Sequence, residues 1–199
     1  MAEPPAARRS HPDSGEADDR RLLILGLGNP MMADDGIGHE VVRRLERCTL
    51  PKGVRLIAVD GDVLALMDMW QGETAVWLVD AVTSEQPAGS LYVLEHQALF
   101  QLPAGGLSTH HPSLSENLRW VLHVRPEMTA ITFRLYGVEA CVVRPERGLS
   151  CTVEEPVAQL VTEITNATRG GYSSPTAPLA RARPIPTVSG TEPPRREIP

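Results

Sequence analysis

Residues 22–38 read LLILGLGNPMMADDGIG, and the rest of the chain is best interpreted outward from this stretch. The continuous apolar run from Leu22 to Leu25 is typical of a strand that is buried on both faces. The Gly-Leu-Gly-Asn-Pro sequence that follows indicates a loop, because neither a strand nor a helix tolerates it. An apolar face at helical spacing comes next, formed by Ile37, Val41, Val42 and Leu45. We therefore predict a strand, a loop and a helix, with polar residues at the carboxyl end of the strand.

Two adjacent carboxylates, Asp34 and Asp35, lie where this helix is expected to start. A capping role would explain Asp34, because aspartate is a favoured N-cap and its charge is stabilised by the helix dipole. A purely structural role explains Asp35 less well. Two like charges side by side in a glycine-framed loop repel each other unless a cation or a donor offsets them.

Apolar strands and helical patterns alternate along the rest of the chain. Further strands are expected at residues 54–59, 75–79, 90–94 and 132–138, and further helices near residues 64–70, 114–122 and 153–164. This alternation predicts an α/β fold, with a twisted, mostly parallel five-stranded sheet and helices on both faces. The predicted folded domain spans residues 21–168. The flanking segments, 1–20 and 169–199, bury too little apolar surface to offset their ordering entropy and are predicted to be disordered.

Composition argues against several classes of protein. The formal net charge of −6 argues against binding to a nucleic-acid backbone, which needs a basic face. No apolar run approaches the length of a membrane span, and residues 1–20 lack the hydrophobic segment of a secretory signal. We expect a soluble cytoplasmic protein with no nucleic-acid or membrane partner. The cysteines, Cys48, Cys141 and Cys151, show no paired spacing and are expected to be reduced structural thiols.

Potential metal ligands follow several of the predicted strands. Asp35 comes after the first strand, Asp80 after the third, and a histidine pair at 110–111 precedes a helix. The carboxyl ends of neighbouring strands converge at one edge of such a sheet, so these residues can meet there. Two carboxylates and an imidazole suit a borderline divalent metal, nickel or zinc, and leave coordination positions open. Asp60 and Asp62, after the second strand, compete with Asp80, and spacing does not choose between them.

An ordered set of motifs extends over nearly the whole predicted domain. It comprises Gly26-x-Gly28-Asn29, Asp34-Asp35-Gly36-x-Gly38, Val79-Asp80-Ala81, Ser108-Thr109-His110, and Gly137-Val138 near Gly148-Leu149-Ser150. This set resembles the hydrogenase maturation endopeptidase family. Members of that family trim the carboxyl-terminal extension from the large subunit of nickel-iron hydrogenases once nickel is in place. The resemblance implies an endopeptidase that acts as a monomer on such a precursor.

The resemblance also implies a set of site residues. The family's first acidic metal-binding position falls on Asp35, the second falls on Asp80, and the histidine falls on His110. His110 fits better than the adjacent His111 because of its distance to the following helix. Asp60 matches another acidic position, which supports the site. Asp35, Asp80 and His110 are thus expected to be both the catalytic and the metal-contacting residues, with nickel supplied by the precursor.

Other functions share parts of this pattern. The chain has no Gly-x-Ser-x-Gly elbow, no His-Glu-x-x-His helix and no evident Cys-His pair, so a conventional protease mechanism is not indicated. Peptidyl-tRNA hydrolases also open with Gly-Leu-Gly-Asn-Pro, as residues 26–30 do here, but an acidic loop and a negative net charge do not suit tRNA. A non-catalytic nickel checkpoint that binds the hydrogenase precursor would use the same ligands. The sequence does not separate that checkpoint from the protease.

Overall fold

A five-stranded sheet lies at the centre of the computed structural model, which describes residues 21–84, 86–102 and 114–170. The strands are β1 (Leu22–Gly26), β2 (Val54–Ala58), β3 (Ala75–Val82), β4 (Leu91–Glu95) and β5 (Thr132–Glu139). Their order across the sheet is β2-β1-β3-β5-β4. Only the β4–β5 pair is antiparallel within this sheet. The predicted α/β fold and its mostly parallel five-stranded sheet are confirmed.

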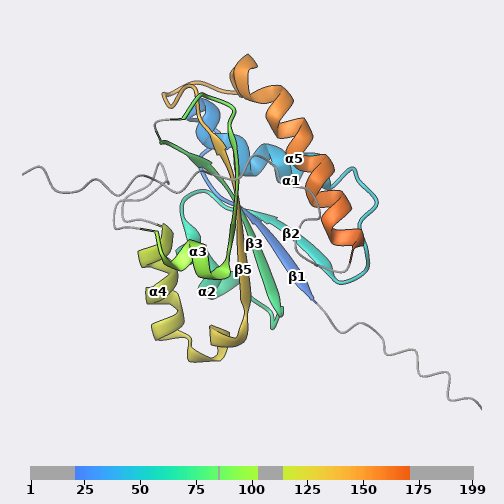
Figure 1. Cartoon of the computed structure of the whole chain (residues 1–199), viewed down its shortest axis with the longest axis vertical. Coiled ribbons are helices and arrows are strands. Elements are labelled where there is room, and N and C mark those ends of the chain that lie inside the picture. Colours follow the sequence, from blue (N-terminus) through green and yellow to red (C-terminus); the bar gives the residue numbers. More distant parts are fainter. Residues whose placement is uncertain (1–20, 85, 103–113, 171–199) are drawn as a thin grey trace, which may run out of the picture.

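Helices cover both faces of the sheet (Figure 1). One face carries α1 (Ile37–Leu45) and α5 (Cys151–Arg169); the other carries α2 (Leu66–Met69), α3 (His96–Phe100) and α4 (Leu114–Val124). Three short 3-10 helices complete the described elements: η1 (Ala33–Gly36), η2 (Val63–Ala65) and η3 (Pro126–Ala130). Each face buries its own apolar core, with Trp77 and Val79 of β3 in one and Val76 and Leu78 in the other. Among the described residues, no helix combines the length and the apolar character needed to cross a membrane.

Some elements differ from the prediction. The helices α3 and η3 were not predicted, because five residues are too few to show a helical repeat. The third strand was predicted to end at Val79, yet β3 continues to Val82. The reason is the long partner strand β5, which pairs with β3 as far as Val82 and Glu139. Asp80 therefore lies inside a strand rather than after it.

The strand order creates a switch point between β1 and β3. The chain leaves β1 for β2 on one side and then returns to form β3 on the other side of β1. In open α/β sheets, the crevice beyond the carboxyl ends of two such strands is the usual place for a ligand site. The polar residues that follow β1 and those near the end of β3 lie at this edge of the sheet.

Glycines allow α1 to pack directly on the backbone of these two strands. A Cβ atom on Gly38 would lie 2.2 Å from the Leu27 carbonyl oxygen and 2.7 Å from the Val79 carbonyl oxygen. A Cβ atom on Gly26 would lie 2.2 Å from the Gly38 carbonyl oxygen. No side chain fits at these distances, so glycine at both positions sets how closely the first turn of α1 approaches the sheet.

Replacing Gly38 by alanine tests this close approach. We expect Gly38→Ala to lower the free energy of unfolding by about 2 kcal/mol or more, because backbone atoms rather than flexible side chains must move. Gly170→Ala is the matched control, since its Cβ atom would lie 3.7 Å from the nearest atom, the Ala167 carbonyl oxygen. Urea unfolding of the two variants measures the difference. Equal stability would contradict the role assigned to Gly38.

Candidate active site at the carboxyl edge

Asp35 lies in η1, just beyond the end of β1, and is 3% exposed. Its Oδ2 atom accepts a hydrogen bond of 2.9 Å from the backbone N–H of Asn29. The loop can fold back this tightly because Gly28 has a φ of 118° and no Cβ atom, which would lie 1.9 Å from the Asp35 carbonyl oxygen. The loop of residues 26–30 therefore holds the Asp35 side chain in place.

Asp80 lies on β3 and is 1% exposed. Its position in the strand alternates with Val79, so it shares a face with Val76 and Leu78, the face that α4 covers. The 3-10 helix η1, which contains Asp35, packs against β3. The structure thus brings Asp35 and Asp80 to the carboxyl edge of the sheet, at the ends of the adjacent strands β1 and β3.

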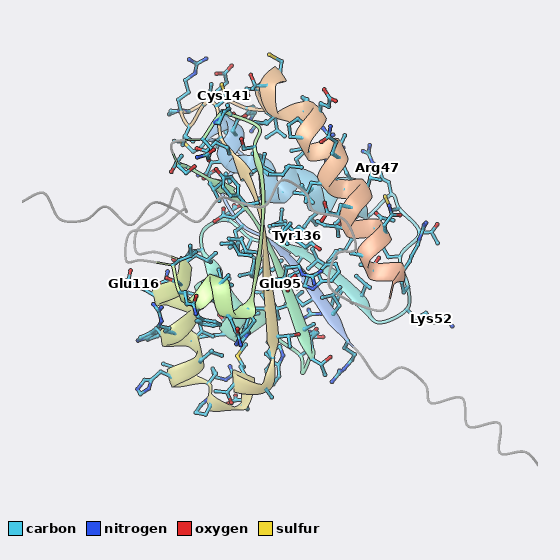
Figure 2. The ribbon with its side chains drawn as sticks, in the orientation of Figure 1. Arg47, Lys52, Glu95, Glu116, Tyr136 and Cys141 are labelled. Carbon is cyan, nitrogen blue, oxygen red and sulfur yellow. The ribbon has the colours of Figure 1, made fainter. Side chains whose placement is uncertain are left out.

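Asp34 has a different role from the predicted one. The N-cap of α1 is Gly36, with no side-chain capping bond, so the expected capping role of Asp34 is wrong. Its Oδ2 atom instead accepts hydrogen bonds from the backbone N–H groups of Cys141 and Val142, both 2.9 Å, and from Ser150 Oγ, 2.8 Å. Its Oδ1 atom accepts a bond of 2.7 Å from the Ser150 backbone N–H. Asp34 therefore joins the loop after β1 to the segment after β5, where Figure 2 labels Cys141.

Backbone hydrogen bonds reinforce this junction. The Ala33 N–H donates to the Glu146 carbonyl at 2.7 Å, and the Glu146 N–H donates to the Met31 carbonyl at 3.0 Å. Ala33 has a φ of 50°, a left-handed conformation that costs energy in a residue other than glycine. The bonds on both sides of Ala33 hold it there, and Asp35, two residues on, is placed by the same loop.

The acidic residues after β2, Asp60 and Asp62, have partners of their own, and Gly61 between them forms a β-bridge with Gly28. Asp62 caps η2, because its Oδ1 atom accepts a 2.8 Å bond from the Leu64 N–H, and its Oδ2 atom accepts a 3.1 Å bond from Asn117 Nδ2. The Asp60 side chain is 78% exposed, and its Oδ1 atom lies 3.1 Å from His39 Nε2 of α1. Asp62 is thus a structural residue, and Asp60 lies on the surface beside α1.

The third expected ligand, His110, and its neighbour His111 fall outside the described residues. Within the ranges that the structure describes, no three His, Cys, Asp or Glu side chains gather as a metal site. The cysteines Cys48, Cys141 and Cys151 form no disulfide; Cys48 is half-buried, whereas Cys141 and Cys151 are exposed and not part of the core that a structural role predicts. Asp35 and Asp80 are therefore the described part of the expected site.

Removing the Asp34 carboxylate tests its role in the junction. We expect Asp34→Ala to lower the free energy of unfolding by about 3 kcal/mol, because three backbone N–H donors and one hydroxyl lose a charged acceptor. Ser150→Ala removes only the hydroxyl bond, so a loss of about 1 kcal/mol is expected. Urea unfolding curves distinguish the two. An Asp34→Ala variant as stable as Ser150→Ala would show that the junction does not depend on this carboxylate.

A family model that matches the sequence identifies the family, and solved structures share the fold. The model of the hydrogenase maturation protease family, HycI, matches residues 39–167, which is more than half of the chain; the match includes Asp80 and begins after Asp35. The chain is 26% identical over 151 residues to the hydrogenase 2 maturation protease of Escherichia coli (strain K12), covering 75% of this chain and 91% of that protein.

Protein FrxA of Pyrococcus furiosus is 29% identical over 123 residues, covering 62% of this chain and 85% of that protein. The fold is similar to that of the [NiFe] hydrogenase maturation protease HybD from Thermococcus kodakarensis, with a TM-score of 0.64 and 24% identity over 74% of this chain and 99% of that one. It is also similar to the endopeptidase HybD from E. coli, with a TM-score of 0.62 and 24% identity over 75% and 93% of the two chains. This chain belongs to the hydrogenase maturation protease family and is an endopeptidase.

Proposed function

We propose that this endopeptidase removes the carboxyl-terminal extension of a nickel-iron hydrogenase large-subunit precursor after nickel insertion, and that it recognises the bound nickel. The observation that carries this proposal is the placement of two buried aspartates, Asp35 and Asp80, at the switch point between β1 and β3. The name of the T. kodakarensis relative, a [NiFe] hydrogenase maturation protease, supports the choice of substrate.

The proposed contact set is Asp35, Asp80 and His110. Two carboxylates and one imidazole form a mixed oxygen and nitrogen donor set that suits a borderline divalent ion such as nickel. In this proposal the nickel belongs to the precursor and arrives with it. A precursor that has not been loaded lacks this contact, so the protease distinguishes a finished metal centre from an unfinished one.

Hydrolysis also needs a base for the attacking water. The oxygen of the water bonds to the scissile carbonyl carbon, the C–N bond breaks, and the leaving amine gains a proton. An aspartate carboxylate at this edge can take the proton of the water, and a metal ion can polarise the carbonyl. We propose that Asp35 or Asp80 provides the base, since both lie at the carboxyl edge.

The mass of the precursor tests the proposal. Purified protein is mixed with nickel-loaded and with nickel-free large-subunit precursor, and mass spectrometry follows the loss of a carboxyl-terminal peptide. Loss is expected only in the nickel-loaded sample. Asp35→Asn, Asp80→Asn and His110→Ala are each expected to reduce the rate by about a hundredfold or more, because a contacting group is removed. His111→Ala is the matched control and should retain activity.

Other outcomes would revise particular parts of the proposal. Equal cleavage of nickel-free precursor would contradict recognition of nickel. A stable complex without any change in mass would favour a checkpoint over a protease. Loss of activity in His111→Ala but not in His110→Ala would move the histidine contact by one residue. Tight, stoichiometric zinc in the purified protein would contradict a metal supplied by the precursor.

A further inference from the structure

Another buried carboxylate, Glu139, lies at the carboxyl end of β5 and is 3% exposed. Its Oε1 atom accepts a 2.6 Å hydrogen bond from the Ser84 backbone N–H. Its Oε2 atom accepts bonds from Ser84 Oγ, 2.8 Å, and from the Tyr92 hydroxyl, 2.6 Å. The two hydroxyl oxygens lie 2.7 Å apart. We call Ser84, Tyr92 and Glu139 the Glu139 cluster.

The Glu139 cluster is a set of donors around one acceptor. Burial and the hydrogen bond to Glu139 raise the pKa of Tyr92 to about 12, so its hydroxyl remains a donor at neutral pH. The backbone of Glu139 is bound as well: its N–H donates to the Ser90 carbonyl, and its carbonyl accepts from the Gly89 N–H, both at 2.8 Å. One residue of β5 thus contacts both ends of the connection between β3 and β4.

This cluster shares a sheet face with Asp80. Asp80 of β3 and Tyr92 of β4 are both in register with Gly137, which lies on the strand between them. Adjacent strands are about 4.8 Å apart, so the Cα atoms of Asp80 and Tyr92 are separated by about 10 Å. Gly137 leaves little space, since a Cβ atom there would lie 3.4 Å from the Tyr92 Cβ atom and 2.9 Å from Val82 Cγ1.

Asp80 depends on this side of the sheet for its position. The pairing of β1 with β3 ends at Gly26 and Val79, so the stretch from Asp80 to Val82 pairs with β5 alone. Ser84, two residues beyond Val82, is the next anchored point, and Glu139 holds it through two hydrogen bonds. Ala81 and Val82 remain paired with β5 if the Glu139 cluster is broken, but the end of β3 loses its anchor at Ser84, four residues beyond Asp80.

Residues 139–142 also hold the loop that contains Asp35. Two and three residues after Glu139, the Cys141 and Val142 N–H groups donate to Asp34. We propose that Ser84, Tyr92 and Glu139 are positioning residues that fix Asp80 relative to Asp35, with residues 139–142 as the common support. This inference rests on the proposed function of the two aspartates, and it assigns to the cluster no contact with the substrate.

Conservative changes in the cluster test this role. Tyr92→Phe keeps the ring and removes one bond, and Ser84→Ala removes the hydroxyl, which Ser84→Thr restores. Tyr136→Phe is the control, because Tyr136 is a buried tyrosine of β5 on the opposite face whose hydroxyl accepts a 3.1 Å bond from Arg134 (Figure 2). Initial rates of cleavage of nickel-loaded precursor give kcat and KM for each variant, and thermal denaturation gives Tm.

We expect kcat to fall about tenfold in Tyr92→Phe and in Ser84→Ala, because a small displacement of a reacting group costs a large factor in rate. KM should change by less than about twofold, since the inference assigns the cluster no contact with the precursor. Ser84→Thr and Tyr136→Phe should keep the kcat of the unmodified protein. Wild-type kcat in Tyr92→Phe and Ser84→Ala, or the same loss in Tyr136→Phe at equal Tm, would overturn the inference.

Amide hydrogen exchange separates this inference from the proposed function. If the unmodified protein does not cleave nickel-loaded precursor, the proposed function fails, and exchange then decides whether the cluster positions Asp80. Faster exchange at residues 80–84 in Tyr92→Phe, about tenfold, with no change there in Tyr136→Phe, supports positioning. Unchanged exchange at residues 80–84 overturns it.

Discussion

The Asp34 carboxylate makes the interaction on which the candidate site depends. Its two oxygens accept four hydrogen bonds, three from backbone N–H groups and one from a hydroxyl. Bonds from backbone amides to a buried carboxylate are strong, because the acceptor is charged and the surroundings have a low dielectric constant. They fasten the loop after β1 to the segment after β5. Asp35 is the next residue in the chain, so the bonds of its neighbour determine where it lies.

The adjacent residues Asp34 and Asp35 therefore have different hydrogen-bond partners. Placing like charges next to each other in a buried loop is costly unless donors surround them, and the donors around Asp34 meet that requirement. The Asp35 side chain turns toward the glycine loop, where the Asn29 N–H contacts it. The division follows from geometry, because successive residues of a 3-10 helix point in different directions. Asp34 faces the segment after β5, and Asp35 faces the Asn29 N–H.

The sheet supplies the second half of the site through its connectivity. Since β2 forms on the outer side of β1, the inner side of β1 is left for β3, and the carboxyl ends of these two strands lie at the same edge of the sheet. Close backbone contact at Gly26 and Gly38 keeps α1 against this edge. Beyond the end of β1, only β5 continues to pair with β3. The stretch of β3 from Asp80 to Val82 therefore depends on β5 for its strand pairing.

The sequence alone determined the fold class, the five strands, and the association of Asp35 and Asp80 with the ends of β1 and β3. These features follow from short-range patterns: apolar runs, helical spacing, and glycines at a tight loop. The tertiary structure was needed to separate Asp34 from Asp35, because the partners of Asp34 lie 107 to 116 residues away.

Only the tertiary structure, likewise, showed that β3 extends past Asp80, that Asp62 is a cap, and that Glu139 joins Ser84 and Tyr92 across 55 and 47 residues. A carboxylate shows no periodicity, and its role is set by whichever donors the fold brings to it. Local patterns in the chain carry no information about such donors. The sequence could therefore identify candidate acidic residues but could not assign a role to each.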